Sequence, residues 1–173
     1  MAGDSLITVV AIILAAILLF VFPLITLADR TDDISQVAVQ TATVEFVDEV
    51  RTTGRLTEDN YYDFIETVNA TGNTYSFELE LRRLDENPSK KSANANRQII
   101  GENTYYSIYT TQILDELEEG TVYLKQGDMF TAGVVNTNQT LSEVLKNFFY
   151  KITGNSSNTI TAKHSGVVTV DGQ

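Results

Sequence analysis

Residues 6–28, with the sequence LITVVAIILAAILLFVFPLITLA, form an apolar run without a charged side chain. As a helix the run would be roughly 34 Å long, at about 1.5 Å per residue, while the hydrocarbon core of a bilayer is about 30 Å thick. A cleaved secretory signal would need a basic segment, a shorter apolar stretch and a small-residue cleavage site. Residues 1–5 contain no Lys or Arg. The run therefore predicts a transmembrane helix rather than a signal or a buried core helix.

The rest of the chain is acidic and contains no cysteine. The sequence has 12 Lys and Arg against 23 Asp and Glu, and only Asp4 precedes the apolar run. The densest positive cluster, Arg82-Arg83 with Lys90-Lys91, is embedded among acids. Such a surface repels phosphate backbones, so nucleic acid is not an expected partner. The absence of cysteine excludes disulfides, thiolate metal sites and thiol nucleophiles.

A juxtamembrane charge cluster follows the apolar run and consists of Asp29, Arg30, Asp32 and Asp33. We expect the cluster to mark the lipid boundary and to face water or a positive partner, because unpaired charges are costly in lipid or packed surroundings. The positive-inside rule counts basic residues near the ends of the helix, and here it finds only Arg30, which lies among acidic residues. The rule therefore says little about the orientation of the helix. The short N-terminal stub of residues 1–5 favours an extracytoplasmic head.

Two features inside the run bear on helix packing. Thr8, Ala11, Ala15 and Ala16 give the helix a face of small side chains, which allows close contact with another helix in lipid, although a lone anchor needs no such contact. Pro23 removes one helical hydrogen bond and is expected to bend the helix. The bend is either a plain kink or a flexible segment that serves when helices pack in a filament.

The helix is expected to continue beyond the membrane as an amphipathic segment over residues 29–53. Apolar positions recur there at steps of three and four residues, at Ile34, Val37, Thr41, Val44 and Val47, with Phe46 and Val50 alongside. No Gly or Pro interrupts residues 24–53. We therefore expect one continuous helix with one face packed on the head, and the alternative is two helices joined at residues 29–33.

Residues 54–173 are expected to fold as one small α+β head domain with mostly antiparallel strands. Gly54 should end the long helix, and Thr57 should cap a short helix over Glu58–Asn69. Apolar and polar residues alternate through residues 75–82, and this period of two predicts a half-buried strand.

The remaining patterns predict a series of short elements. In chain order they are an exposed loop over residues 85–98, a helix over residues 105–117 whose first half is alternatively a strand, a hairpin of residues 122–124 and 129–135, a helix from Thr140 to Gly154, and one or two strands over residues 159–170 joined near Ser165-Gly166. The helix after Thr140 carries an apolar stripe interpreted as core, formed by Val144, Leu145, Phe148, Phe149 and Ile152.

The sequence offers little to an enzyme. It contains no phosphate-binding Gly-rich loop, no nucleophile elbow and no zinc-binding histidine pair. The single histidine, His164, is interpreted as a surface side chain, and acid pairs such as Glu78 and Glu80 lack the spacing of a calcium loop. We therefore expect no enzyme activity, no catalytic residue, no cofactor and no bound metal.

A group of tyrosines gives an alternative function. The rings at Tyr61, Tyr62, Tyr105, Tyr106 and Tyr109 are able to stack on sugars, although tyrosines also fill small cores. On this hypothesis the chain is a bitopic ligand-binding or sensor domain that contacts peptidoglycan or another polysaccharide.

Four stretches of the sequence carry a resemblance to a known family. They are Phe46-Val-Asp-Glu-Val-Arg-Thr-Thr-Gly54, Asn69-Ala-Thr-Gly-Asn-Thr-Tyr75, Leu84-Asp-Glu-Asn-Pro88 and Gly127-Asp-Met-Phe130. Together with the apolar helix, its distal proline, its amphipathic continuation and the small head, they resemble the TadE-like or pilin-like proteins found beside pilus-assembly genes in Firmicutes, on the general plan of type IV pilins and pseudopilins.

The resemblance implies a non-enzymatic structural subunit of a cell-surface pilus or related envelope assembly. Its partners would be the lipid bilayer of the cell membrane and, through the N-terminal helix, other copies of itself or other pilin-like subunits. Such pilins resemble one another in a Gly cleavage point followed by Glu at the fifth mature position. Cleavage after Gly3 here would place Thr8 there. This departure favours a minor pilin or pseudopilin-like component over the shaft subunit.

Overall fold

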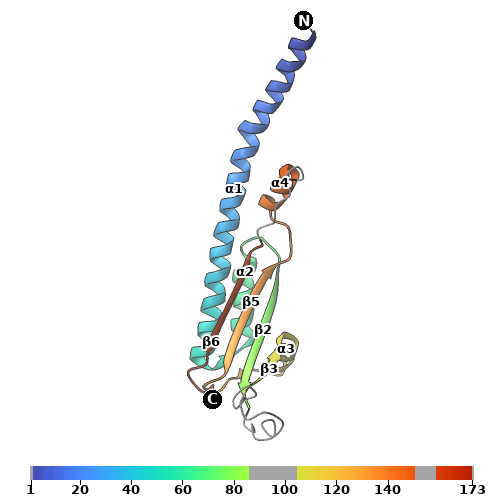
Figure 1. The fold of residues 1–173 in the computed structure, drawn as a ribbon. Helices are drawn as coiled ribbons and strands as arrows, with labels where there is room; N and C mark the ends of the chain where they lie inside the picture. Colours follow the sequence, from blue (N-terminus) through green and yellow to red (C-terminus); the bar gives the residue numbers. More distant parts are fainter. Residues whose placement is uncertain (1, 86–104, 151–158, 173) are drawn as a thin grey trace, which may run out of the picture. The chain divides into compact units, whose positions relative to one another are not determined.

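The computed structural model describes residues 2–85, 105–150 and 159–172 and has the expected α+β fold, with a long N-terminal helix followed by a small antiparallel sheet and further helices (Figure 1). Internal contacts divide the chain into two units. The N-terminal unit contains Met1–Ser35 and Gln139–Asn158, and the sheet unit contains Gln36–Asn138 and Thr159–Gln173. Residues 86–98 of the expected loop lie outside the described residues.

Helix α1 spans Ala2–Thr53 without a break, so the prediction of one continuous helix is confirmed. The alternative joint at residues 29–33 is helical throughout, and Pro23 lies inside the helix. The end of α1 also agrees with the sequence. Gly54 has a φ of 66°, and its N–H donates to the Val50 carbonyl at 2.9 Å, which closes the last turn.

Helix α2 spans Glu58–Asn69, as the capping signals predict. The Asn60 N–H donates to Thr57 Oγ1 at 3.3 Å, and the Thr57 N–H donates to Asn60 Oδ1 at 2.9 Å. This reciprocal pair satisfies two backbone donors that the first turn would otherwise leave open. The helix buries one side of its surface in the sheet unit, through Tyr61, Phe64 and Val68.

The main sheet has four antiparallel strands in the order β3-β2-β5-β6. They are β2 (Tyr75–Leu84), β3 (Tyr105–Tyr109), β5 (Met129–Asn136) and β6 (Thr161–Val167). Strand β2 confirms the predicted alternation, because Leu79 and Leu81 are buried while Ser76 and Glu78 are exposed. A second antiparallel pair joins β1 (Arg55–Leu56) to β4 (Val122–Tyr123).

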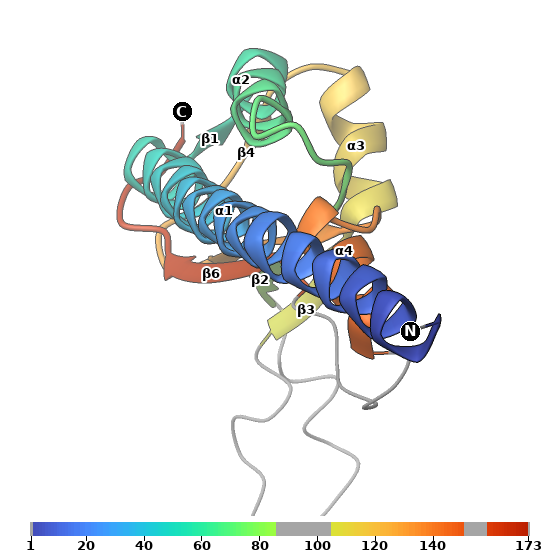
Figure 2. The ribbon, with the colours of Figure 1, turned by 90° about the horizontal axis from the view of Figure 1, so that it is seen from above.

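The core of the sheet unit forms where α2 and the second half of α1 cover one face of the sheet (Figure 2). Phe46 of α1 stacks on Phe64 of α2, with 4.3 Å between ring centroids, and meets Phe130 of β5 edge-on at 5.7 Å. Phe64 in turn meets Phe77 of β2 edge-on at 5.6 Å. The second half of α1 is therefore part of the core rather than a separate stalk.

The face of α1 that enters the core agrees with the predicted one only in part. The buried side chains are Val39, Ala42, Thr43, Phe46, Val47 and Val50. Of the predicted positions, Val47 belongs to this set together with Phe46 and Val50, which were expected alongside the stripe, while Ile34, Val37 and Val44 are exposed. Two overlapping series at helical spacing exist in this segment. The series with Phe46 and Val50 is buried because its aromatic ring fits between α2 and β5.

A helix was predicted over residues 105–117, with a strand as the alternative for its first half. The structure has the strand. Tyr105–Tyr109 form β3, and helix α3 begins only at Thr110 and ends at Glu118. The strand pairs along β2, with Leu81 opposite Ile108 and Arg82 opposite Ser107. Aromatic and β-branched residues fit this half-buried ladder better than a helix.

The predicted hairpin of residues 122–124 and 129–135 is wrong. Strand β4 pairs with β1, whereas β5 pairs with β2 and β6, so the two strands do not pair with each other. The turn itself exists, since the Asp128 N–H donates to the Lys125 carbonyl at 3.0 Å and Gly127 has a φ of 95°. Near the C-terminus, β6 passes through Ser165 and Gly166 as one strand, without the alternative joint there.

Helix α4 spans Leu141–Tyr150 and belongs to the N-terminal unit. The Glu143 N–H donates to Thr140 Oγ1 at 3.2 Å, which agrees with the predicted cap. The interpretation of its stripe as core is wrong for Val144, which is 48% exposed, while Leu145 is half-buried. The side chains of Phe148 and Phe149 lie outside the described part of the chain, as do Ile152 and Gly154.

Candidate functional site

The N-terminal unit presents the apolar half of α1 as an open surface. Every side chain from Leu6 to Phe20 is exposed, and large apolar residues such as Leu19 are exposed by 70%. Within the described residues, α1 is the one helix long and apolar enough to cross a membrane. It therefore fits a membrane anchor, and over residues 6–20 its apolar surface is not covered by any other described part of the chain.

The small side chains predicted to allow helix packing lie on this exposed surface. Thr8, Ala11 and Ala15 follow one another at steps of three and four residues and so share one side of the helix, with Ala16 next to them. Pro23 is also exposed, and α1 continues through it. The structure thus places these residues where a second helix could reach them.

The juxtamembrane charge cluster is divided between internal contacts and solvent. Asp29 accepts hydrogen bonds from Ser142 Oγ and from Lys146 Nζ of α4, the latter at 2.5 Å. Asp32 Oδ2 accepts from Thr140 Oγ1 at 2.6 Å. Arg30 and Asp33 are exposed. The positive partner expected for the cluster is therefore, for Asp29, a lysine of the same chain.

These contacts tie α4 to one side of α1. Ala28, Asp32 and Ser35 follow at steps of four and three residues, and Ala28 and Ser35 are buried to 4% exposure. On the α4 side, Thr140 and Ser142 are buried to 3% and 2%. Helices α1 and α4 thus form a polar interface around Asp29 and Asp32, directly after the last residue of the apolar run. We call this interface the seam.

The electrostatics of the seam make it sensitive to acid. The hydrogen bonds from Lys146 and, second, from Ser142 hold the pKa of Asp29 below its ordinary value of 3.8, against an opposite effect of burial. A lowered pKa means that the ionised form stabilises the seam. This stabilisation is present above pH 3.8 and is lost as the pH falls through the lowered pKa.

We therefore expect α4 to separate from α1 in acid. Spin labels at Ile34→Cys and Asn147→Cys, in the full chain, should give a narrow distance distribution near pH 6 that broadens below about pH 3.8. The matched variant Asp29→Asn, which cannot form the ion pair, should broaden the distribution at both pH values. A distribution that stays narrow in acid would show that the Asp29 contacts do not hold α4.

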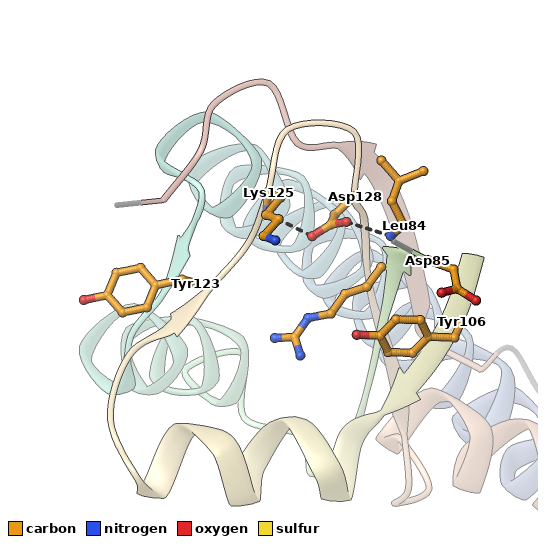
Figure 3. A pocket seen from close by; sticks show the side chains of 7 residues that line it. Leu84, Asp85, Tyr106, Tyr123, Lys125 and Asp128 are labelled. Atoms are coloured by element: carbon orange, nitrogen blue, oxygen red, sulfur yellow. Dashed lines mark hydrogen bonds between the residues drawn. The ribbon is translucent and has the colours of Figure 1, made fainter. Parts of the chain in front are cut away.

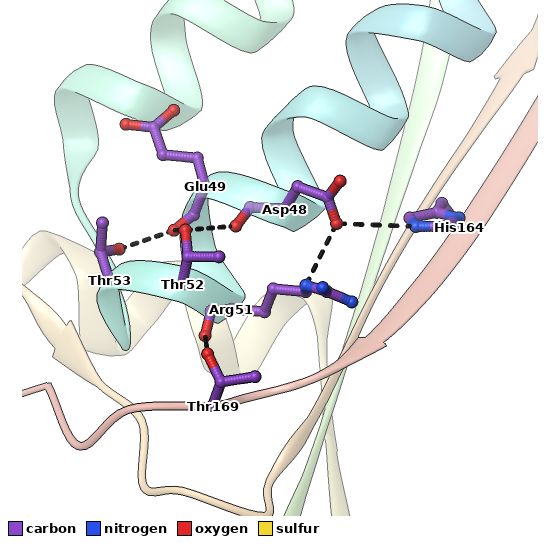
Figure 4. A network of polar contacts seen from close by, with 7 residues as sticks. All are labelled: Asp48, Glu49, Arg51, Thr52, Thr53, His164 and Thr169. Atoms are coloured by element: carbon purple, nitrogen blue, oxygen red, sulfur yellow. Dashed lines mark hydrogen bonds and ion pairs between the residues drawn. The ribbon is translucent and has the colours of Figure 1, made fainter.

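The sheet unit contains a polar network at the end of α1 (Figure 4). Arg51 Nε lies 3.2 Å from Asp48 Oδ1, an ion pair without hydrogen-bond geometry, and His164 Nε2 lies 4.0 Å from the same oxygen. The Thr169 N–H donates to the Arg51 carbonyl at 3.0 Å. The network joins α1 to β6 and the segment after it. The side chain of His164, interpreted from the sequence as a surface side chain, is 35% exposed and lies beside Asp48.

The sheet unit also contains a second candidate site, which is a pocket of about 390 Å³ (Figure 3). It is lined by Arg83, Leu84, Asp85, Tyr106, Tyr123, Lys125 and Asp128. Asp128 is fixed in place, because its carboxylate accepts from the Leu84 N–H at 3.0 Å and from the Lys125 N–H at 2.9 Å. The carboxylate therefore holds the turn beside the pocket.

The guanidinium of Arg83, which lines the pocket, already forms an ion pair within the protein. Its Nη1 and Nη2 donate to the two carboxylate oxygens of Glu116 at 3.0 and 2.8 Å. Burial opposes the charge of Arg83, but the Glu116 carboxylate and, after it, Tyr106 together outweigh burial and raise the pKa of Arg83 above its ordinary value. A ligand anion would have to compete with Glu116 for this guanidinium.

The five tyrosines of the alternative hypothesis do not surround one cavity. Tyr61 is buried in the core beside Phe46, and burial raises its pKa. Tyr62 and Tyr109 are exposed by 61% and 60%, and neither lines the described pocket. Of the five tyrosines, only Tyr106 lines that pocket. A further tyrosine, Tyr123, also lines it but was not among the five named from the sequence.

Sequence reasoning missed the partners of the charge cluster. Thr140, Ser142 and Lys146 lie more than a hundred positions after Asp29, and the sequence held no local signal that connects them. The sequence showed only that Ser142 and Lys146, four residues apart, would share one side of a short helix. Within residues 2–85, 105–150 and 159–172, no group of three or more His, Cys, Asp or Glu is placed to hold a metal ion.

Comparisons with protein-family models, with curated proteins and with solved structures gave no match to this chain.

Proposed function

We propose that the protein is a non-enzymatic structural subunit of a cell-surface pilus or related envelope assembly, anchored in the cell membrane by α1, with the sheet unit on the extracytoplasmic side. One observation carries the proposal. The single helix α1 exposes an apolar half from Leu6 onward and contributes its other half to the core of the sheet unit. Anchor and folded domain thus share one continuous element.

The physical argument concerns where the apolar half of α1 can be placed. An exposed apolar surface of this extent is stable only in lipid or against other apolar surfaces. Because the helix is continuous into the core, the sheet unit stays attached to this surface when the helix leaves the bilayer. The same face can therefore contact lipid before assembly and sister helices afterwards. The resemblance of the sequence to type IV pilins and pseudopilins supports this exchange.

The small-residue side of α1 is the preferred contact between subunits. In lipid, helices associate through packing rather than through the hydrophobic effect, and small residues allow their backbones to approach. Thr8, Ala11 and Ala15 form such a side. Thr8 also stands where pilins of this plan carry a glutamate, which is why we propose a minor pilin or pseudopilin-like subunit instead of the shaft.

Crosslinking tests the proposed contact directly, because the chain has no cysteine of its own. Ala15→Cys should give several-fold more disulfide-linked product in intact membranes than Ile13→Cys, with itself or with another pilin-like subunit carrying a cysteine at the corresponding position. Ile13 is a matched control, since it lies two residues away on the opposite side of the helix and is 54% exposed. Equal yields from both variants would contradict a specific packing face.

A ligand-binding domain is the second candidate, and the pocket beside Tyr106 and Tyr123 favours it. If the pocket binds a glycan, Tyr106→Ala should abolish retention of the full chain on purified peptidoglycan. Tyr62→Ala removes a more exposed ring that does not line the pocket and serves as the control. Retention that is absent from the wild type, or equal in both variants, would remove this candidate.

A further inference from the structure

Over residues 141–147, the part of α4 whose side chains the structure describes, polar side chains face α1, Leu141 and Val144 face outward and Leu145 is half-buried. Ser142 and Lys146, four residues apart, both contact Asp29 of α1. Leu141 and Val144, three residues apart, are exposed by 66% and 48%. At about 100° per residue the two pairs lie roughly 150° apart around the helix axis. An amphipathic helix that packs against its own protein normally buries the apolar side, so this arrangement is reversed.

The position of α4 along α1 indicates what the apolar side of α4 contacts. Thr140, directly before α4, contacts Asp32, and the next two contacts are to Asp29, the first residue after the apolar run. Asp29 and Asp32 are separated by about 4.5 Å along the helix axis. The start of α4 is therefore held within one helical turn of the point where the apolar surface of α1 ends.

We propose that α4 is an interfacial helix, which lies at the lipid–water boundary and inserts Leu141 and Val144 into the bilayer that α1 spans. The inference rests on the proposed membrane anchor. Interfacial helices bury their apolar face about 5–10 Å into the boundary between headgroups and acyl chains, and α4 is held beside Asp29, the first residue after the apolar run. The protein is then held by one spanning and one interfacial helix, joined through the seam at Asp29 and Asp32.

The charges around α4 indicate which lipids it needs. The juxtamembrane cluster contributes three aspartates and one arginine, and Glu143 of α4 adds a further acid beside Lys146. A site with excess negative charge gains nothing from anionic headgroups. Insertion should therefore depend on apolar contact, and vesicles of phosphatidylcholine alone should suffice.

Tryptophan quenching tests the position of α4, because the chain has no tryptophan. The full chain is reconstituted in phosphatidylcholine vesicles with or without brominated acyl chains. Leu141→Trp carries the probe on α4, and Val144→Trp repeats it at the second exposed position. Phe20→Trp is the reference within the span, and it is matched in exposure at 66%. Val44→Trp is the reference in water, about 22 Å beyond Asp29 along α1.

Lipid insertion predicts that the emission of Leu141→Trp and Val144→Trp shifts to shorter wavelength. It also predicts quenching by the brominated lipid at a level between those of Phe20→Trp and Val44→Trp. Quenching equal to that of Val44→Trp, with Phe20→Trp strongly quenched, would overturn the interfacial helix and leave the anchor intact.

Two other outcomes would also overturn the inference, for different reasons. A blue-shifted Leu141→Trp that brominated lipid does not quench would assign this face to a second protein copy. An unquenched Phe20→Trp would overturn the membrane anchor and the interfacial helix together. Circular dichroism of each variant, compared with the wild type, identifies any variant that has lost its fold, and the second α4 position then decides.

Discussion

Replacing Phe46 by alanine should lower the free energy of unfolding of the sheet unit by about 3–5 kcal/mol, as expected for the loss of a buried phenylalanine. Phe46 is 3% exposed and makes ring contacts with Tyr61, Phe64 and Phe130. Its truncation would therefore leave a cavity where α1, α2 and β5 meet. Urea unfolding of the full chain in detergent, followed by near-ultraviolet circular dichroism of the tyrosines, measures the change.

Val44→Ala is the matched control for this variant. Val44 lies on the same helix, two residues earlier, and is 39% exposed. Its truncation should change the free energy of unfolding by less than about 1 kcal/mol. Both variants should still fractionate with membranes, because the apolar half of α1 is unchanged. Equal losses from both variants would contradict the assignment of the second half of α1 to the core.

Gly54→Ala should destabilise the sheet unit by roughly 3 kcal/mol or more, because backbone strain and a steric clash combine. Gly54 has a φ of 66°, a conformation that alanine adopts only with strain. A Cβ at this position would lie 2.5 Å from the Val170 carbonyl oxygen and 2.7 Å from the Gly172 nitrogen. Both neighbours are backbone atoms, so the C-terminal segment would have to move.

Gly72→Ala separates strain from clash. Gly72 has a φ of 86°, but a Cβ there meets no atom within 4 Å. This variant should therefore show only the cost of the positive φ, about 1–3 kcal/mol, in the same urea unfolding experiment. If Gly54→Ala were no more destabilising than Gly72→Ala, the close approach of the C-terminal segment to the end of α1 would be wrong.

Elements with local signals were predictable from the sequence. Helix α2 has its cap, its acidic first turn and its apolar side within Thr57–Asn69, and strand β2 has its alternation within one segment. The continuation and the end of α1 followed from the absence of Gly and Pro over residues 24–53 and from Gly54 directly after them. In each case the free energy that selects the structure comes from neighbouring residues, so a short window contains the information.

Elements set by distant partners were not predictable in the same way. Strand β4 pairs with β1, more than sixty positions earlier, although a turn beside it favoured pairing with β5. The choice of the α1 face depended on Phe130, and the outward apolar side of α4 depended on the seam with Asp29. Several pairings satisfied the local pattern equally in each case, and only tertiary packing distinguishes them.

The small-residue face and the charge cluster could be named from the sequence, but their partners could not. The small residues of α1 were visible because any transmembrane helix presents its residues at known spacing. The engagement of Asp29 and Asp32 by α4 required the fold, which converts two of the three aspartates from solvated charges into internal contacts. Charge reversal at Asp33 is therefore a cleaner probe of assembly than reversal at Asp32.

The most direct test of the structural role is the composition of surface filaments. Filaments sheared from cells that express the full chain, and purified away from membranes, are digested and analysed by mass spectrometry. The proposed function predicts peptides of this protein in the filament fraction at a low ratio to the shaft subunit, and their loss in a variant with Ala11, Ala15 and Ala16 replaced by leucine. Peptides confined to the membrane fraction would contradict the proposal and leave α1 as a plain anchor.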